Sequence, residues 1–258
     1  MRILQINSVC DFGSTGRTTR EFADYLEQQG HECYVAYGQG TSSYHRSFKI
    51  GGKWENHFHN AFYTRLLGLH GYGTRCGTKK LIEWIEEIKP DIIHLRNLHA
   101  NYLNFPLLFE YLAKTKIPVV FTLHDCFNFT GKCAHYTARK CYKWKTECSH
   151  CPTFRNCVAP SMIFDQSQKL FLQKKNLYDQ MNIQAVIAVS KWLAGEAKQS
   201  ALFSTAHRIS HIYNWIDYTK FHRADKDEIE AFYQKYNLSK DYKYIISDSQ
   251  GWDNNASR

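Results

Sequence analysis

The stretch PDIIHLRNLHANYLN, residues 90–104, decides the fold class. Its proline ends the amphipathic pattern TKKLIEWIEEI (residues 78–88), because a proline cannot continue a helix. The next five residues, DIIHL, contain two isoleucines and a leucine and indicate a buried strand. Polar residues follow this strand at once. The order of helix, strand and polar ending is typical of a parallel βαβ unit.

The same alternation recurs on both sides of this stretch. We expect a doubly wound α/β fold with a mainly parallel, Rossmann-like sheet. Two segments break the rhythm: residues 38–77 have no clear period, and residues 126–157 form a cysteine-rich insertion. The predicted strands are residues 2–7, 32–37, 91–95, 119–123, 185–190 and 208–214, and the predicted helices are residues 18–30, 78–88, 105–114, 165–180 and 191–202.

The last forty residues repeat the alternation once more. Residues 225–238 predict a polar helix, and residues 242–251 predict one more strand that enters a turn. A lone strand cannot bury itself. This strand therefore either joins the preceding sheet or begins a second domain.

The chain has 258 residues with a net charge of +9, which favours acidic partners such as nucleic acid, nucleoside diphosphates or an anionic membrane. A cationic surface kept for solubility explains the charge equally well. The opening apolar run is too short for a signal peptide, and no apolar run approaches the ~20 residues of a membrane span. Nine cysteines, an odd number, fit a full disulfide framework badly. We expect a cytoplasmic protein with reduced thiols.

A glycine loop, Gly13-Ser14-Thr15-Gly16, lies between the first strand and the first helix. Free backbone N–H groups at a helix N-terminus bind phosphate, and Arg17 adds a fixed positive charge. The spacing matches no standard phosphate-binding motif. The alternative is an ordinary turn with a glycine at positive φ and Thr18 as the helix N-cap.

Two strand endings carry groups suited to chemistry. Arg96, Asn97 and His99 follow one strand, and His124 and Asp125 follow another. Ligands bind beyond the carboxyl ends of strands in open α/β sheets. His124 could act as an acid, as a base or as a hydrogen-bond donor to a phosphate, with Asp125 orienting it. Alternatively, His94 and His124 are strand-ending histidines whose ring nitrogens are simply hydrogen-bonded.

The insertion holds four cysteines with the spacing C-x7-C-x6-C-x2-C. Four soft thiolates suit a tetrahedral structural zinc, which would stabilise a loop that has little apolar content. Free buried thiols and an iron–sulfur centre are the alternatives. The predicted ligands are Cys133, Cys141, Cys148 and Cys151, with Cys157, His135 and His150 close enough in sequence to replace one of them.

Residues 52–75 interleave aromatic, leucine and basic side chains. That mixture suits contact with an anionic membrane face or with an acceptor lipid. A helix that covers the sheet explains the leucines equally well and is slightly preferred.

The strings LQINSVCDFGSTGR, PDIIHLRNLHANYLN and TLHDCFNFTGKC with its following cysteines resemble the bacterial family 4 glycosyltransferases, in particular the colanic-acid and capsular-polysaccharide subgroup. The resemblance implies a retaining GT-B enzyme with two Rossmann-like domains. Residues 1–238 would be the acceptor-side domain, and residues 239–258 the first strand and turn of a truncated donor-binding domain. Trp215 stands in the string NWID where the family commonly has glycine.

The resemblance also implies roles for the candidate residues. Residues 13–17 would lie against the phosphates of a nucleotide-diphosphate sugar, the co-substrate, and His124 would stand in the cleft near the transferred sugar. Residues 96, 97 and 99 would face the acceptor, although Arg96 stands where relatives often carry histidine. The cysteines would shape the loop after His124 without taking part in sugar transfer.

The expected function is transfer of a sugar to a glycan or lipid-linked acceptor in surface polysaccharide biosynthesis, at the inner face of the membrane. This chain alone is expected to be nearly inactive, because the donor pocket is missing. One alternative is a non-catalytic acceptor- or membrane-binding module that works with a separate donor domain. A zinc-containing nucleic-acid binder is weaker still, because the basic residues are spread along the chain.

Overall fold

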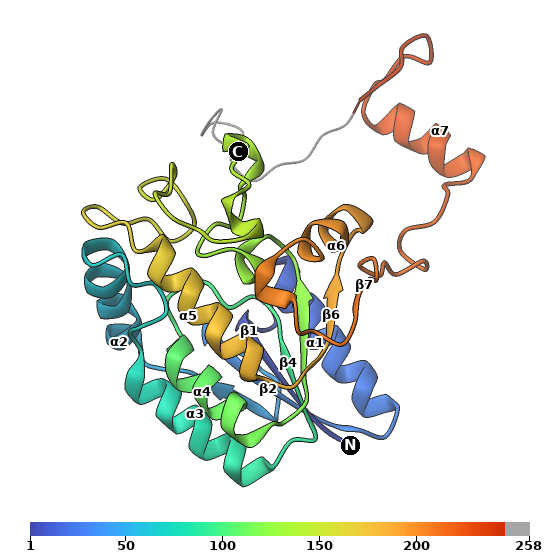
Figure 1. Ribbon diagram of the computed structural model, residues 1–258. Coiled ribbons are helices and arrows are strands. Elements are labelled where there is room, and N and C mark those ends of the chain that lie inside the picture. Colours follow the sequence, from blue (N-terminus) through green and yellow to red (C-terminus); the bar gives the residue numbers. More distant parts are fainter. Residues whose placement is uncertain (246–258) are drawn as a thin grey trace. The chain divides into compact units, whose positions relative to one another are not determined.

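Seven strands form one sheet in the order β3-β2-β1-β4-β5-β6-β7 in the structure, a computed structural model that describes residues 1–245 (Figure 1). Each neighbouring pair is parallel, which confirms the predicted doubly wound α/β fold class. The strands are β1 (Arg2–Val9), β2 (Glu32–Gln39), β3 (Ser47–Lys49), β4 (Ile92–Leu95), β5 (Val119–Leu123), β6 (Ile183–Ala188) and β7 (Ile209–His211).

Helices follow most strands, as the alternating pattern predicts. The α-helices are α1 (Gly13–Gln28), α2 (Lys53–Phe58), α3 (Arg75–Ile88), α4 (Phe105–Thr115), α5 (Ser167–Gln180), α6 (Lys191–Ala197) and α7 (Lys226–Lys235). A π-helical segment, η1 (His59–Leu66), continues α2, and short 3₁₀ turns η2 (Phe127–Phe129), η3 (Thr137–Arg139), η4 (Lys143–Lys145) and η5 (Ala201–Phe203) complete the set. The chain divides into two units, Met1–Tyr213 and Asn214–Arg258. The domain boundary predicted at residues 238 and 239 stays a prediction.

Three local expectations need correction. Residues 38–77 are not irregular, because they contain β3, α2 and η1. Helix α1 begins at Gly13 with Phe12 as its N-cap and no side-chain cap, so Thr18 lies inside the helix and is not its N-cap. Residues 242–245 form no strand, and the remainder of the strand predicted at 242–251 lies outside the described residues.

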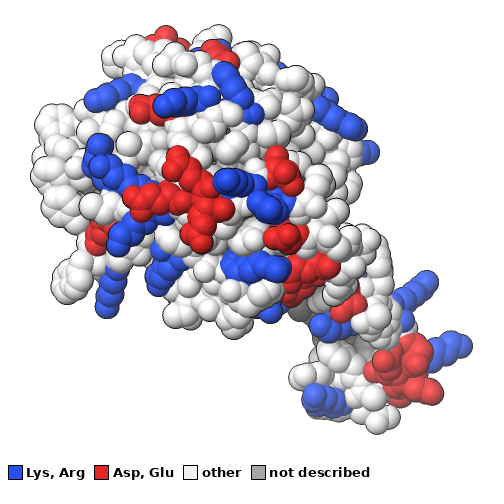
Figure 2. All heavy atoms as spheres, turned by 90° about the horizontal axis from the view of Figure 1, so that it is seen from below, with Lys and Arg blue, Asp and Glu red and all other residues white. Residues whose placement is uncertain are grey.

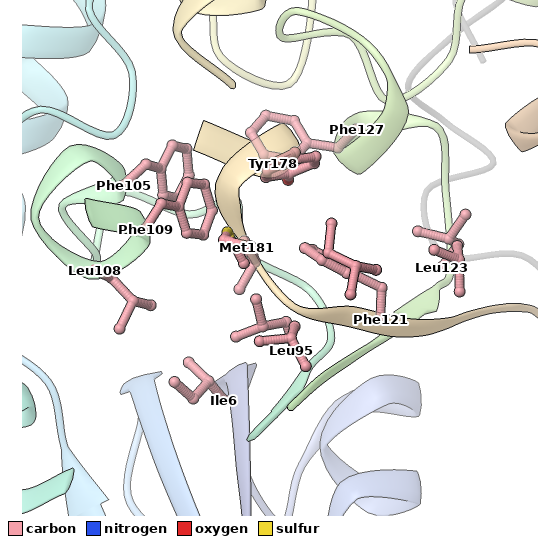
Figure 3. Packing of buried hydrophobic residues seen from close by; sticks show 14 of the residues in the cluster. Ile6, Leu95, Phe105, Leu108, Phe109, Phe121, Leu123, Phe127, Tyr178 and Met181 are labelled. Atoms are coloured by element: carbon pink, nitrogen blue, oxygen red, sulfur yellow. The ribbon is translucent and has the colours of Figure 1, made fainter. Parts of the chain in front are cut away.

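The two faces of the sheet carry separate cores. Helix α1 covers one face with a small cluster that includes Ala23, Val35 and Tyr37. Helices α3, α4 and α5 cover the other face (Figure 1). There Phe121, Leu95 and Tyr178 belong to one continuous apolar cluster (Figure 3). Burying large side chains on this scale is the main favourable term in folding.

Charges are mixed on the molecular surface. On the face that Figure 2 shows, Lys and Arg side chains alternate with Asp and Glu and do not form one basic stripe. This mixture does not favour a nucleic-acid-binding face on that side of the described residues. No helix within residues 1–245 combines the length and the apolarity that crossing a bilayer requires.

One close packing contact positions the polar edge of the sheet. A Cβ atom on Gly38, at the end of β2, would lie 2.0 Å from Cγ of Tyr102. Tyr102 is fully buried, and its hydroxyl donates a hydrogen bond to the carbonyl oxygen of Asn97 at 2.9 Å. Because residue 38 is glycine, the ring of Tyr102 fits against β2, and from there its hydroxyl holds the loop after β4.

A matched pair of glycine substitutions tests this contact. Gly38→Ala should lower the free energy of unfolding by about 1–3 kcal/mol, because the buried ring of Tyr102 has little room to move. Gly195→Ala should leave it unchanged or raise it by up to about 1 kcal/mol, since Gly195 lies within α6 and its Cβ would meet no heavy atom within 4 Å. Urea denaturation measures both values. Equal stability of the two variants would contradict the packing argument.

Candidate functional site

The loops after β1, β4 and β5 meet at the carboxyl edge of the sheet, where open α/β sheets bind ligands. Arg96, the first residue after β4, is the centre of this meeting and is only 3% exposed. Its Nη1 donates to Oε1 of Gln5 at 3.0 Å, and its Nη2 donates to Oγ1 of Thr18 at 2.7 Å. The guanidinium thus joins β1, β4 and α1.

The charge of Arg96 has no carboxylate partner among the ion pairs of the described residues. Its hydrogen-bond acceptors are neutral, and its Nε has no partner within residues 1–245. Burial lowers its pKa to about 10, so the side chain still carries its charge at neutral pH. A buried cation without an anion is costly and points to a ligand that supplies one.

His124, the first residue after β5, lies beside this guanidinium. Its Nε2 is 3.4 Å from Nη2 of Arg96. Burial and the charge of Arg96 lower the pKa of His124 to about 4. The imidazole is therefore neutral at pH 7, and one ring nitrogen can accept a proton or a hydrogen bond.

A second pair couples the same two loops. Nε2 of His99 is 2.9 Å from Oδ2 of Asp125, and Oδ1 of Asp125 accepts from the backbone N–H of Phe127 at 2.8 Å. Burial alone would raise the pKa of Asp125, but the hydrogen bond and charge of His99 outweigh it and lower that pKa. The hydrogen bonds of the Asp125 carboxylate go to His99 and Phe127, and the expectation that Asp125 orients His124 stays a prediction.

The backbone of Asn97 is fixed in place by a hydrogen bond to Asn7. Its N–H donates to Oδ1 of Asn7 at 3.0 Å, and Nδ2 of Asn7 in turn donates to Oγ1 of Thr19 at 2.9 Å. Asn7 and Thr19 are buried. The structure thus brings the predicted residues 96, 97, 99, 124 and 125 to one edge.

The glycine loop lies at the same edge. Gly13 has φ +65°, which favours glycine, and it starts α1 directly after the loop from β1. The first N–H groups of α1 have no partner within the helix, and the side chain of its N-cap residue, Phe12, makes no capping hydrogen bond to them. Ser14 and Arg17 are exposed. This end of α1 can bind an anion through backbone N–H groups, with the charge of Arg17 at the surface.

The cysteine insertion does not behave as predicted. Cys133, Cys141, Cys148 and Cys151 line one small cavity. Within residues 1–245, however, no group of three or more His, Cys, Asp or Glu side chains is arranged to hold a metal ion, so the structure does not support the predicted zinc. Burial raises the pKa of Cys133 to about 11 and that of Cys148 to about 12, so both are neutral thiols at pH 7.

Apolar packing and a buried lysine hold the insertion instead. Trp144 is 1% exposed and packs against Phe129, with ring centroids 5.0 Å apart. Nζ of Lys174, from α5, donates to the carbonyl oxygens of Phe127 and Thr130 at 3.0 and 3.1 Å. Sequence reasoning missed Lys174 because an isolated lysine in an amphipathic helix reads as a surface residue.

His94 matches the expectation of a strand-ending histidine whose ring is hydrogen-bonded. Its Nε2 is 2.7 Å from Oγ1 of Thr122, and its ring packs edge-on against Phe22. It faces α1 within the sheet and is 8% exposed. The ring is a satisfied core group, whereas His124 lies next to an unpaired charge.

Comparison with known proteins agrees with this arrangement. The family described as "Glycosyltransferase Family 4" matches residues 15–220. The chain belongs to glycosyltransferase family 4. The matched residues include the candidate residues after β4 and β5 and the start of α1 from Thr15 onward.

The chain is also similar to a curated protein named for colanic acid biosynthesis. The chain is 33% identical over 97 residues to the "Putative colanic acid biosynthesis glycosyl transferase WcaC" of Escherichia coli (strain K12). That alignment covers 36% of this chain and 23% of the relative. The chain therefore matches about a quarter of the relative's length.

The buried histidines of this family 4 domain predict a pH dependence of stability. The pKa is lowered by burial to about 4 in His59 and, with help from Arg96, in His124, and it lies well below 6.5 in His70 and His94. An unfolded histidine takes up a proton near pH 6.5. The unfolded state then binds protons that the native state does not, so stability falls as the pH drops below about 6.5 and continues to fall toward 4.

Urea denaturation at pH 7.0 and pH 5.5 measures this effect. We expect the free energy of unfolding to fall by about 1 kcal/mol for each buried histidine. His207→Gln should leave the pH dependence unchanged, because His207 is exposed. A free energy of unfolding that stays constant between the two pH values would show that the histidines are protonated in the native state.

Proposed function

We propose that this chain is the acceptor-side part of a retaining GT-B glycosyltransferase. The enzyme would transfer a sugar from a nucleotide-diphosphate sugar to a glycan or lipid-linked acceptor of a surface polysaccharide. Family membership and the relative named for colanic acid biosynthesis support this proposal. Residues 1–238 would form the acceptor-side domain, and residues 239–258 the beginning of the donor-binding domain.

The buried charge of Arg96 is the observation that carries the proposal. It lies between the N-terminal part of α1 and His124, and its partners among the described residues are neutral. Sugar transfer from a nucleoside diphosphate builds negative charge on the leaving diphosphate. A fixed cation and free helix N–H groups stabilise such charge without reorganisation during the reaction.

The other site residues then have separate tasks. The N–H groups of residues 14–16 and the Arg17 side chain would face the donor diphosphate. Neutral His124 would hydrogen-bond to the transferred sugar, and Asn97 and the His99–Asp125 pair would face the acceptor. In a retaining reaction the acceptor hydroxyl attacks from the face that the diphosphate leaves.

Substituting Arg96 tests the proposal. In the longest form of the protein that its gene encodes, Arg96→Gln should lower sugar transfer by about a hundredfold or more, since it removes the charge opposite the leaving group. Arg96→Lys should restore only part of the activity, because lysine lacks the planar guanidinium whose two Nη atoms donate to Gln5 and Thr18 at the same time. The measurement is transfer from a panel of radiolabelled nucleoside diphosphate sugars to a membrane lipid extract.

The control is Arg75→Gln, which removes an exposed arginine at the start of α3. It should retain full transfer. Arg96→Gln removes a buried charge but also takes the donor away from Oε1 of Gln5 and Oγ1 of Thr18, so the free energy of unfolding should fall by about 1–3 kcal/mol while the chain stays folded. Full activity of Arg96→Gln would refute the assigned role, and loss of both folding and activity would make Arg96 a structural residue.

We further propose that the protein contacts an anionic membrane at the cytoplasmic face, where thiols stay reduced. Trp54, Phe58, Phe62 and Leu66 repeat every four residues along α2 and η1 and are 85%, 57%, 38% and 38% exposed. Met162, whose N–H donates to the carbonyl oxygen of Arg65, is 67% exposed. These residues form an apolar stripe on the surface.

The charges beside the apolar stripe match an anionic partner. Lys53, His57 and Arg65 lie in the same helical segment. Glu55 is the one carboxylate of residues 53–66, and its oxygens accept from the backbone N–H groups of Cys76 and Gly77. A segment with exposed aromatics and basic residues binds an interface between anionic headgroups and acyl chains.

Vesicle co-sedimentation tests the membrane contact. The protein should bind phosphatidylglycerol vesicles more than phosphatidylcholine vesicles, and added salt should weaken the binding. Trp54→Ser combined with Phe58→Ser should lower the affinity at least about tenfold, because two aromatic anchors are lost. Tyr25→Ser removes an aromatic residue that is 56% exposed on α1 and should bind like the wild type. Equal binding by the wild type, the double variant and Tyr25→Ser would refute the proposal that the apolar stripe contacts the membrane.

A further inference from the structure

A polar cavity of about 340 Å³ lies behind the helical segment that carries the apolar stripe. Its walls come from the ends of β2 and β3, from α2 and η1, and from the loop after β4. The loop contributes Ala100 and Asn101, which directly follow His99 of the candidate site. The cavity thus adjoins the acceptor side of that site through one short loop.

The charges around this cavity have one sign. Lys49, Lys53 and His57 line it, and no aspartate or glutamate is among its described lining residues. Asn60 and Asn101 add amide groups. Nζ of Lys49 donates to the carbonyl oxygen of Gly40. Two ammonium groups, an imidazole and amides around a hollow of this size fit a phosphoryl group, which lysine binds as a point charge.

The loop that lines the cavity has an unusual backbone. Ala100 has φ +108° and Asn101 has φ +57°. Positive φ is tolerated by asparagine but is a strained conformation for alanine. The carbonyl oxygen of Ala100 accepts from Nε2 of Gln39 at 3.0 Å, and Oδ1 of Asn101 is 3.1 Å from Nδ1 of buried His70. The fold therefore holds this strained turn in place at the cavity wall.

The same helical segment faces two environments. Lys53, Asn56, His57 and Asn60 line the cavity, and Lys53 and His57 are also exposed to solvent. Trp54 and Phe58 do not line the cavity and are exposed. A ligand with an anionic group next to an apolar chain would satisfy both. A sugar-free anion in solution satisfies only the cavity.

We propose that this cavity is a subsite for a phosphoryl group of the acceptor, with Lys49 and Lys53 as its cationic contacts. The proposal rests on the proposed function, because it assigns the acceptor class to the same enzyme. The phosphoryl group would lie on the acceptor side of the loop at residues 96–101, apart from the donor diphosphate at the start of α1. The acceptor would be a phosphorylated or diphosphorylated molecule, and one carrying a lipid chain would also contact the apolar stripe.

Isothermal titration calorimetry with inorganic pyrophosphate tests the subsite without sugar transfer. The wild-type chain should bind pyrophosphate, and Lys49→Gln combined with Lys53→Gln should weaken this binding at least about tenfold, since each lysine makes a charge-assisted contact. The matched control is Lys114→Gln combined with Lys198→Gln. These lysines lie at the C-terminal ends of α4 and α6, at the opposite edge of the sheet, and are exposed. The control should bind like the wild type.

Each other outcome overturns the proposal. Absence of pyrophosphate binding in the wild type would show that the cavity holds no phosphoryl group. Unchanged binding in the variant at residues 49 and 53 would place the anion elsewhere, for example at the start of α1. Circular dichroism confirms that each variant is folded.

Phosphatidylglycerol vesicles distinguish the two sources of anionic charge. Lys49→Gln alone should keep at least half of the wild-type vesicle binding, because the apolar stripe and the basic residues of its helical segment are intact. Loss of vesicle binding with unchanged pyrophosphate binding would assign Lys49 to the membrane surface and overturn the subsite. Since neither readout requires sugar transfer, failure of the subsite remains distinguishable from failure of the glycosyltransferase assignment.

Discussion

The hydrogen bonds of the Arg96 guanidinium are the interaction on which the polar edge of this fold depends. One nitrogen bonds Gln5 of β1, and the other bonds Thr18 of α1 and approaches His124 after β5. Three chain segments that are distant in sequence are thereby set against one charge. Burying this charge is unfavourable, and the free energy gained by burying the apolar residues of the two cores offsets that cost. A structural role alone would be served as well by neutral side chains of similar volume.

Lys174 is a second buried cation whose hydrogen bonds join separate segments of the chain. Lys174 is fully enclosed, and burial lowers its pKa to about 7, yet it bonds two carbonyl oxygens of the loop after β5. Its ammonium also lies 3.9 Å from the ring centroid of Phe127, so the aromatic face adds to its stabilisation. The cysteine insertion is thus anchored through backbone carbonyls and aromatic packing. This anchoring keeps the wall beside His124 in a defined position.

The helical segment α2–η1 links the candidate site to its surroundings. Polar side chains of this segment line a cavity and its aromatic side chains are exposed, and in the part of the chain that the structure describes its basic side chains form no ion pair. The one acidic residue is occupied by backbone N–H groups of α3. A membrane-facing stripe and an anion-binding cavity on one segment would place an acceptor's head and tail at fixed relative positions. The strained loop at Ala100 and Asn101 connects this segment to His99.

The sequence by itself determined the alternation of strands and helices and the edge at which chemistry occurs. These follow from local causes: apolar β-branched runs make buried strands, prolines and glycines end helices, and parallel strands bring their polar endings to one edge. Residues 91–99 and 119–125 could therefore be assigned before any coordinates. The tertiary structure alone decided what those side chains do. It paired Asp125 with His99, left Arg96 without a counterion among the described residues, showed the predicted zinc ligands as partly exposed free thiols and found order in residues 38–77. These outcomes depend on distances between segments far apart in the chain, on which local sequence pattern carries no information.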